Sequence, residues 1–364
     1  MKVLFFISSM RGGGAERVMS ILCNHLTNRG HEVFLATNTS IPFAYTLDEN
    51  VKIIDLYKEN HSTKNKLLYF LRLYQNIRSI IKTIRPDISV SFIWSLNVHV
   101  LIAKTGLSAP VITSEHSTFT RISSRYEYFV RICLNKLAKK VIVLTEKDAN
   151  FIGNRLNRMV IPNPLSYTPT TSKKERRENI LAVGSIDRWE GKGFDNLIRI
   201  WSNIHKQYPG WVLEIAGTGK SENFNYLKSL AQDLGVSSSV VFLGFQKEIN
   251  LLMQNSSVFV LASKYEGFPM VLNEAMSQGC ACASFDCNTG PAEIITHNKN
   301  GLLVENQNMD KMQQTLSRLL NDKTLREKLS KNAIKDVERF SPGLIVDKWE
   351  KVMTEVRRET LKLN

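Results

Sequence analysis

Long apolar runs are missing from the sequence, which contains no stretch of the roughly 18 uncharged apolar residues that a membrane-spanning helix needs. The first residues, MKVLFFIS, have the apolar character of a signal peptide. Arg11 and a run of glycines follow them without a cleavage pattern. We therefore expect a first β-strand here instead of a secretion signal.

Cysteine is also scarce, with five residues that are scattered over the chain. The closest group, Cys280, Cys282 and Cys287, has no fourth ligand nearby and contains no CxxC pair. This pattern argues against a zinc site. We expect reduced thiols in the core of a cytoplasmic protein.

Acidic residues are few in the first half of the chain. Residues 1–164 contain 22 Lys and Arg but only 11 Asp and Glu, and most of the net charge of +14 therefore lies there. A basic half favours either nucleic acid or an anionic membrane surface as a partner. Because the sequence shows no zinc finger, RNA-binding signature or basic heptad, we expect an anionic membrane surface and no nucleic acid.

Apolar runs alternate with helical patterns along the chain, and 364 residues suffice for two domains. This alternation predicts an α/β fold of parallel sheets with crossover helices. The first unit runs from a strand at Val3–Ile7 through the glycines 12–14 into an amphipathic helix that ends near Gly30. The loop lacks the GxGxxG spacing and the acidic residue of a nicotinamide site, so it is a weak candidate for one.

Two segments of the basic half combine cations with aromatic and aliphatic residues. Residues 64–85 predict a helix rich in Leu, Ile, Tyr and basic residues without a single acid. That composition suits a helix lying on anionic lipid, although an amphipathic helix packed on a sheet explains it equally well. The second segment, residues 121–140, contains the cations Arg121, Arg125, Arg131, Lys136, Lys139 and Lys140 among aromatic residues.

The stretch 257–304 has the most informative pattern. A strand at Ser257–Leu261 leads into the loop Glu266–Pro269 and then into a helix of about ten residues, with Pro269 at its first position. We expect the N–H groups of residues 270–272 to be free donors at the positive end of this helix. Such an end holds phosphate or carboxylate well.

Two carboxylates bracket this expected anion site, Glu266 in the loop and Glu274 on the helix, with seven residues between them. A carboxylate is a poor phosphate ligand but a good acceptor for sugar or ribose hydroxyls. The combination suggests a site for a phosphorylated sugar. The spacing alone is also compatible with two solvated acids.

The sequence EGFPMVLNEAMSQG, followed by a strand and then by GPAEII and NGLLV, resembles the donor-site signature of the family 4 retaining nucleotide-sugar glycosyltransferases. The resemblance implies a GT-B fold, in which two Rossmann-like domains face each other across a cleft and a C-terminal helix crosses back to the N-terminal domain. It implies an acceptor-binding, membrane-facing domain at 1–164, a nucleotide-sugar-binding domain at 165–341 and the returning helix at 342–364. The boundary falls at the prolines of Ile161–Pro164.

The resemblance also implies roles for individual residues of the donor site. Family members bind the diphosphate with a Lys in a KG step and an Arg directly after a first glycine; Lys192 fits, but Ser185 stands where the Arg is expected. Arg188 either supplies the missing charge or leaves phosphate binding mainly to Lys192. Glu266 would bind sugar hydroxyls and Glu274 the ribose. The implied donor-binding residues are Gly13, Gly14, Gly184, Arg188, Lys192, Gly217, Phe245, Glu266, Gly267, Phe268, Pro269, Met270, Val271, Leu272 and Glu274.

A polar cluster follows the predicted strand Val111–Ser114, at the strand end where α/β sheets place ligands. A lone histidine is more often structural, but members of the resembled family often carry one here, which implies that His116 hydrogen-bonds the donor sugar near the reacting carbon. Glu115 would orient His116 or bind the acceptor, which Gly14 would also approach. The implied catalytic residues are Glu266, His116 and Lys192.

The implied reaction is transfer with retained anomeric configuration. Negative charge builds on the leaving diphosphate, so catalysis needs preorganised positive groups there. We expect the departing phosphate oxygen to act as the base, although double displacement through a carboxylate stays open. No DxD sequence occurs, and we expect neither a metal nor another cofactor besides the nucleotide-sugar cosubstrate.

The resemblance thus implies a bacterial hexosyltransferase that extends a polyprenyl-diphosphate-linked saccharide for a surface polysaccharide such as O-antigen. A UDP-hexose or UDP-N-acetylhexosamine is the favoured donor, followed by GDP-mannose. The expected location is the inner face of the plasma membrane, with peripheral attachment. The alternatives are a same-fold enzyme with a soluble acceptor, a nucleotide-sugar epimerase, and a non-catalytic sugar- or nucleotide-binding protein.

Overall fold

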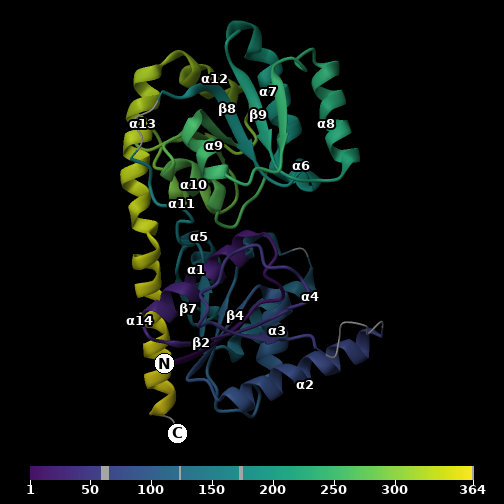
Figure 1. Cartoon of the computed structure of the whole chain (residues 1–364), viewed down its shortest axis with the longest axis vertical. Coiled ribbons are helices and arrows are strands. Elements are labelled where there is room, and N and C mark those ends of the chain that lie inside the picture. The colour runs from purple at the N-terminus through teal and green to yellow at the C-terminus, as the bar shows by residue number, and fades with distance from the viewer. Residues whose placement is uncertain (59–64, 123, 172–174, 363–364) are drawn as a thin grey trace. The chain divides into compact units, whose positions relative to one another are not determined.

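The chain forms two α/β units (Figure 1). The first unit comprises Met1–Ser166 and Phe340–Asn364, and the second comprises Tyr167–Arg339. The computed structural model describes residues 1–58, 65–122, 124–171 and 175–362. Lys64 of the expected helix 64–85, Ser123 of the basic segment, residues 172–174 after the expected boundary, and residues 363–364 lie outside the described residues.

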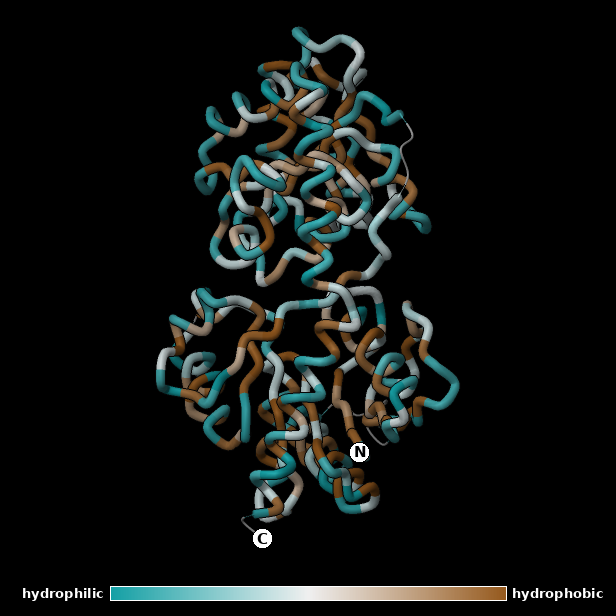
Figure 2. Tube along the Cα trace, turned by 90° about the vertical axis from the view of Figure 1, so that its left-hand side faces the viewer, coloured by the Kyte–Doolittle hydropathy of each residue, from teal (hydrophilic) through white to brown (hydrophobic). Residues whose placement is uncertain are grey.

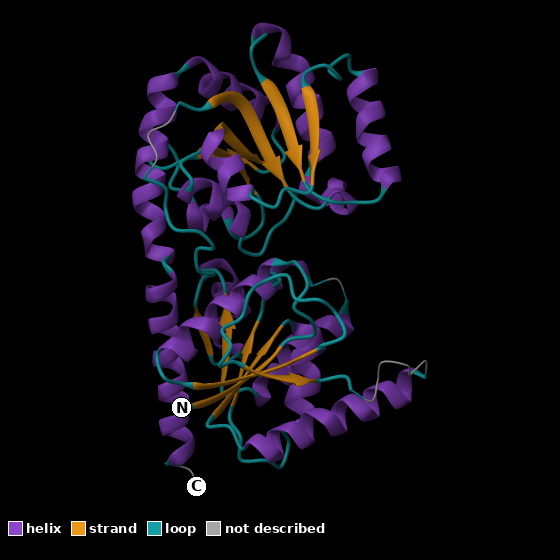
Figure 3. Ribbon diagram, in the orientation of Figure 1, coloured by secondary structure: helices purple, strands orange, loops and turns teal. Residues whose placement is uncertain are grey.

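The first unit is built on a parallel sheet of seven strands in the order β3-β2-β1-β4-β5-β6-β7 (Figure 3). The strand order reverses between β1 and β4, and such a switch point is where open α/β sheets bind ligands. The strands are β1 Lys2–Phe6, β2 Glu32–Thr37, β3 Lys52–Asp55, β4 Ile88–Phe92, β5 Val111–Ser114, β6 Lys140–Val143 and β7 Arg158–Val160.

Helices connect most of these parallel strands, as the alternating pattern predicts, whereas residues 38–51 between β2 and β3 form no helix. The expected helix 64–85 is α2, and the basic segment 121–140 forms short helical turns that include one π-helical turn at Phe129–Cys133. The helices of this unit are α1 Gly14–Asn28, α2 Lys66–Ile84, α3 Trp94–Ala103, α4 Arg125–Tyr128, α5 Glu146–Ile152 and α14 Pro342–Leu361.

The last helix, α14, belongs to the first unit although it follows the second unit in the chain. It packs against α1 and β4, and the ring of Trp349 stacks on Phe92 with ring centroids 5.9 Å apart. An ion pair joins Arg29 Nη1 to Asp347 Oδ1 at 2.7 Å. This arrangement confirms the expected helix that returns to the N-terminal part of the chain.

The second unit contains a parallel sheet of six strands in the order β10-β9-β8-β11-β12-β13. Its switch point lies between β8 and β11, where Val258 pairs with Ile180. The strands are β8 Arg177–Val183, β9 Val212–Ala216, β10 Val240–Gly244, β11 Ser256–Leu261, β12 Ala281–Asp286 and β13 Leu302–Glu305. The helices are α6 Trp189–Lys192, α7 Phe194–Ile204, α8 Ser221–Asp233, α9 Ile249–Asn255, α10 Met270–Ser277, α11 Pro291–Ile294, α12 Met309–Asn321 and α13 Lys323–Asp336.

Hydrophobic segments, brown in Figure 2, run through the interior of each unit. The central strands β4 and β11 are buried along their whole length, because helices cover both faces of a parallel sheet. All five cysteines are free thiols, and four of them are buried, in agreement with the expected reduced core thiols. In the described part of the chain, no helix combines the length and the apolar character needed to cross a membrane.

Candidate active site

The predicted donor residues of the second unit gather at the switch point of its sheet. The segment after β8 carries Gly184, Arg188 and Lys192, the last residue of α6, and the loop after β11 carries Glu266. Because β8 and β11 are adjacent and parallel, their carboxyl ends lie at the same edge of the sheet. Residues that are far apart in the sequence are therefore neighbours in this unit.

The centre of this site is an ion pair between Lys192 and Glu266. Lys192 Nζ lies 2.6 Å from Glu266 Oε1, and the two side chains are only 15% and 14% exposed. Ser263 Oγ donates a hydrogen bond of 2.7 Å to the same carboxylate oxygen. Ser263 was not among the residues expected from the sequence, since a lone serine two residues beyond a strand gives no signal of its own.

The geometry of the Lys192 loop depends on glycine. Gly193 has a φ of +67°, and a Cβ atom there would clash with the carbonyl oxygen of Ala262 at the end of β11. Lys264 N donates a hydrogen bond of 2.9 Å to the Gly191 carbonyl. The glycine that follows Lys192 therefore lets the segment after β8 lie directly against the loop after β11.

A second glycine contact joins Gly184 and Gly217, which follow the adjacent strands β8 and β9. Gly217 has a φ of +156°, and a Cβ atom there would clash with the carbonyl oxygen of Gly184. A Cβ atom on Gly184 would in turn lie 3.2 Å from Lys192 Cδ. Gly184 and Gly217 therefore pack closely against each other, and Gly184 also lies next to the side chain of Lys192.

Two further predicted donor-binding residues of the second unit, Arg188 and Phe245, have exposed side chains. Arg188 is exposed at the end of a 3-10 turn, next to Asp187, whose carboxylate accepts a hydrogen bond of 2.7 Å from Lys220 N at the start of α8. Phe245 follows β10 and is 74% exposed. Both side chains are accessible to a ligand of the second unit.

The helix α10 begins one residue later than expected. Pro269 is the capping residue and Met270 is the first helical residue, a shift within the usual uncertainty of helix ends. The prediction of a free N–H at Leu272 is wrong, because Leu272 N donates to the Pro269 carbonyl at 3.0 Å and the residue is fully buried. The helix start therefore offers the N–H groups of Met270 and Val271, both of which are half-buried.

The loop that precedes α10 is held by the segment after β12. Thr289 Oγ1 donates a hydrogen bond of 2.6 Å to the Glu266 carbonyl, and Thr289 has a φ of +61°, a rare conformation for a β-branched residue. A Cβ atom on Gly290 would lie 2.7 Å from the Gly267 carbonyl oxygen. The backbone of residues 266–269 is thus fixed by close packing.

The donor region contains two further ionisable side chains, Glu274 and Cys287. Glu274 is 7% exposed on α10, so a carboxylate is buried close to the helix start. Burial raises the pKa of Cys287 to about 12, and the negative charges of Glu266 and Asp286 add to this effect. The Cys287 thiol is consequently neutral at physiological pH and not a nucleophile.

The first unit holds its predicted residues in a different setting. Gly13 is the capping residue of α1 and Gly14 is its first residue, and Tyr45 OH donates a hydrogen bond of 3.0 Å to the Gly13 carbonyl. A Cβ atom on Gly13 would clash with the carboxylate of Glu16. Burial raises the pKa of Glu16, a residue that the sequence analysis did not single out.

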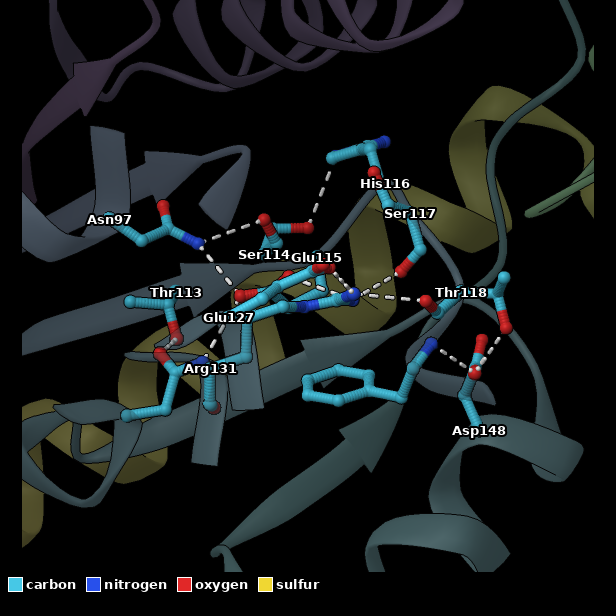
Figure 4. Close-up of polar contacts among 12 residues, drawn as sticks. Asn97, Thr113, Ser114, Glu115, His116, Ser117, Thr118, Glu127, Arg131 and Asp148 are labelled. Carbon is cyan, nitrogen blue, oxygen red and sulfur yellow. Dashed lines mark hydrogen bonds and ion pairs between the residues drawn. The ribbon is translucent and has the colours of Figure 1, made fainter. Parts of the chain in front are cut away.

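Glu115 is not available to bind an acceptor, which corrects that alternative. Its side chain is fully buried, and Oε1 accepts hydrogen bonds from Asn135 Nδ2 at 3.0 Å and from Asn97 Nδ2 at 3.3 Å (Figure 4). Its other oxygen lies 3.2 Å from Arg131 Nη2. The described contacts of Glu115 include no hydrogen bond to His116, so the role of orienting that ring finds no support either.

Arg131 is buried as well, so this cation of the basic segment 121–140 is not available to the expected anionic membrane surface. It donates to the Ser117 carbonyl at 2.7 Å and to the Thr118 carbonyl at 3.0 Å, and its guanidinium lies 4.2 Å from the centroid of the Phe119 ring (Figure 4). Arg131 therefore fixes the loop that follows His116. The sequence could not separate it from the exposed cations around it.

His116 lies at the carboxyl end of β5. Its Nε2 shares a hydrogen bond of 3.2 Å with Ser114 Oγ, and its ring is packed 4.4 Å from Phe92. This dense packing lowers the pKa of His116 to about 3. The ring is therefore neutral at physiological pH and can donate or accept one hydrogen bond, but carries no charge.

Comparison with known proteins agrees with these observations. Residues 167–336 match the family described as "Glycosyl transferases group 1", and residues 12–168 match "Glycosyltransferase Family 4". The chain is 30% identical to the amylovoran biosynthesis glycosyltransferase AmsD of Erwinia amylovora, over 97% of this chain and 99% of that one.

A second relative comes from Campylobacter jejuni and is named GalNAc-alpha-(1->4)-GalNAc-alpha-(1->3)-diNAcBac-PP-undecaprenol alpha-1,4-N-acetyl-D-galactosaminyltransferase. It is 26% identical over 98% of this chain and 99% of its own length. Among solved structures, HepE of Anabaena in complex with UDP-glucose superposes with a TM-score of 0.80 and 18% identity, covering 98% of this chain and 100% of that one. The fold expected from the sequence, GT-B, is confirmed by this similarity and by the two parallel sheets.

Proposed function

Because this chain belongs to glycosyltransferase family 4, we propose that it moves a hexose or N-acetylhexosamine from a nucleotide sugar to a lipid-linked saccharide, with retained configuration. The observation that carries the donor part is the Lys192–Glu266 pair at the switch point of the second sheet. A cation and a carboxylate side by side fit a ligand that has a diphosphate next to sugar hydroxyls.

Charge on the leaving diphosphate is stabilised by the second unit. Lys192 supplies the main cation, and the exposed Arg188 takes the place of the Arg missing at Ser185. The N–H groups of Met270 and Val271 add donors at the positive end of α10. These groups are held in place before the reaction, which is the condition under which electrostatic stabilisation is strongest.

The carboxylates recognise hydroxyl groups. Glu266 binds sugar hydroxyls and so holds the hexose beside its diphosphate, while Glu274 on α10 accepts from the ribose. The departing phosphate oxygen takes the proton of the acceptor hydroxyl. We assign no step to a metal ion, and turnover that continues undiminished in EDTA is the expected result.

The acceptor is proposed to be a polyprenyl-diphosphate-linked saccharide of surface polysaccharide or lipopolysaccharide synthesis. The names of the relatives from Erwinia and Campylobacter support this class, and the second names an undecaprenol-linked acceptor. The first unit supports it with exposed apolar side chains at the start of α2, namely Leu67, Leu68, Phe70 and Leu71. Figure 3 shows this end of α2 extending beyond the sheet of its unit.

Lys66 at the start of α2 is exposed as well, and so are Arg125, Tyr126 and Phe129 in the basic segment 121–140. An apolar surface with exposed cations suits the interface of an anionic membrane. We therefore propose peripheral attachment to the inner face of the plasma membrane, without a nucleic acid partner.

The first experiment measures thermal stabilisation by UDP, GDP, ADP and their sugars. A ligand at about 100 times its dissociation constant stabilises the folded protein by about 2.7 kcal/mol, which gives a clear shift in Tm. We expect the largest shift with UDP and UDP-sugars. Absence of any shift would favour a protein without a donor site.

A second experiment separates the remaining alternatives. The nucleotide sugar that stabilises the protein is incubated with short polyprenyl-diphosphate saccharides or with soluble saccharides, and the anomeric configuration of the product is read by NMR. Transfer to the lipid-linked acceptor with retention is the expected result. Conversion of the nucleotide sugar without transfer would indicate an epimerase.

A further inference from the structure

We propose that Ser263 is a positioning residue that keeps Glu266 oriented for the donor sugar after Lys192 turns to the diphosphate. The inference rests on the proposed function, since it concerns the same donor site. Ser263 lies two residues beyond β11 and is 1% exposed, and its hydroxyl donates to Glu266 Oε1 at 2.7 Å.

Glu266 Oε1 has two donors in this structure, Lys192 Nζ at 2.6 Å and Ser263 Oγ at 2.7 Å. The two donors differ in freedom. The lysine ammonium sits on a flexible four-carbon stem and is attracted by any phosphate that enters, whereas a buried serine hydroxyl can only rotate about one bond. A diphosphate therefore competes for Lys192 but not for Ser263.

When Lys192 binds phosphate, Ser263 is the donor that still holds Oε1. Glu266 Oε2 is then left to accept from a sugar hydroxyl with the carboxylate plane unchanged. Without Ser263 the carboxylate would lose its orientation, and part of the binding energy of the sugar would be spent on restoring it.

The backbone of Glu266 has a separate anchor. Thr289 Oγ1 donates to the Glu266 carbonyl at 2.6 Å, from the segment that follows β12. The main chain at residue 266 is thus fixed whether or not Ser263 is present. Removal of the Ser263 hydroxyl consequently changes the orientation of the Glu266 side chain and leaves the path of the loop in place.

The test compares Ser263→Ala and Ser263→Thr with the matched control Ser284→Ala. Ser284 is a buried serine of the neighbouring strand β12, and its hydroxyl donates to the Phe285 carbonyl. For each variant, calorimetry measures the affinity for UDP and for UDP-glucose, or for the diphosphate and sugar that stabilise the protein best, and kinetics gives kcat and KM.

For Ser263→Ala we expect kcat/KM for the nucleotide sugar to fall about tenfold, the size of one lost hydrogen bond to a charged group. The affinity for the nucleoside diphosphate should stay within about twofold, since Lys192 and the helix start remain. Ser263→Thr, which keeps the hydroxyl, should recover most of the loss, and Ser284→Ala should change neither quantity.

A double variant shows whether Ser263 acts through Glu266. We expect Ser263→Ala to have no further effect on kcat/KM in a Glu266→Ala background, because the side chain that it orients is gone. Additive losses, or equal losses of diphosphate and nucleotide-sugar affinity, would overturn the inference. Failure of the unmodified protein to bind any nucleotide would overturn the proposed function and this inference together.

Discussion

Arg131 Nη2 lies 3.2 Å from Glu115 Oε2, and both side chains are almost completely buried. The pair ties the π-helical turn Phe129–Cys133 to the end of β5, immediately before His116. Arg131 also donates to the two backbone carbonyls that follow His116, those of Ser117 and Thr118. A buried guanidinium therefore determines the shape of the loop that carries the histidine.

Loss of Arg131 should destabilise the protein strongly. An Arg131→Met variant leaves the carboxylate of Glu115 buried without its cation, and breaking such a pair costs about 3–5 kcal/mol. Urea unfolding would measure this loss. Arg125→Met, which removes an exposed cation six residues earlier, is the matched control and should change the free energy of unfolding very little.

The double variant Glu115→Gln/Arg131→Met should recover part of the stability, because residue 115 then no longer carries a buried negative charge without its cation. Equal stabilities of Arg131→Met and Arg125→Met would contradict the assignment of Arg131 to the core.

Removal of the Lys192 ammonium should weaken nucleotide binding. In Lys192→Met the diphosphate loses a charge-assisted hydrogen bond, and Glu266 loses the cation that offsets its repulsion of phosphate. We expect the affinity for the nucleoside diphosphate to fall about ten- to a hundredfold. Calorimetry provides the measurement, with Lys228→Met as the control, because Lys228 is an exposed lysine of α8 in the same unit.

Acid should destabilise the protein through His116. Packing lowers the pKa of this ring from 6.5 to about 3, so between these values the unfolded chain binds a proton that the folded protein does not. Stability should therefore be complete above pH 6.5 and fall as the pH decreases, with a slope of at most about 1.4 kcal/mol per pH unit from this group.

Urea unfolding of the unmodified protein and of His116→Gln between pH 7.5 and pH 4.5 isolates this contribution. The other titrating groups are present in both proteins, so the difference between the two free energies should shrink or change sign as the pH falls. A difference that does not depend on pH would show that His116 is readily protonated in the folded state.

Membrane attachment should depend on the exposed start of α2. Leu67, Phe70 and Leu71 are 69%, 46% and 51% exposed, so replacing all three by serine removes apolar surface without emptying the core. At roughly 25 cal/mol per Å² of apolar area, we expect binding to anionic vesicles to weaken more than tenfold. Co-sedimentation measures it, and Leu251→Ser/Val241→Ser, on exposed sites of the second unit, is the control.

Much of the fold was predictable because buried parallel strands are short apolar runs that end in glycine or polar loops. The strand at 111–114 was predicted residue for residue, and the switch point brings Lys192 to Glu266, two residues that the family resemblance assigned to one donor site. The roles of the individual site residues stay predictions.

Arg131 was misassigned because the burial of a side chain depends on the tertiary fold. Arg131 stands among exposed cations in the sequence, yet its side chain is enclosed by the loop 115–119. Leu272 was expected to offer an N–H group, but the helix forms its first hydrogen bond one residue earlier than a simple count suggests. Ser263 gave no pattern at all, because a single hydroxyl acquires its role only from the carboxylate that it meets.

The chain order of α14 has a consequence for protein synthesis. The sheet of the first unit is translated before the second unit, but the helix that covers α1 and Phe92 is translated after it. At roughly 5–20 residues per second, the ribosome takes on the order of ten seconds or longer to make residues 167–339. During that interval the nascent first unit exposes an apolar face to chaperones, whereas the second unit is complete as soon as its own residues have emerged.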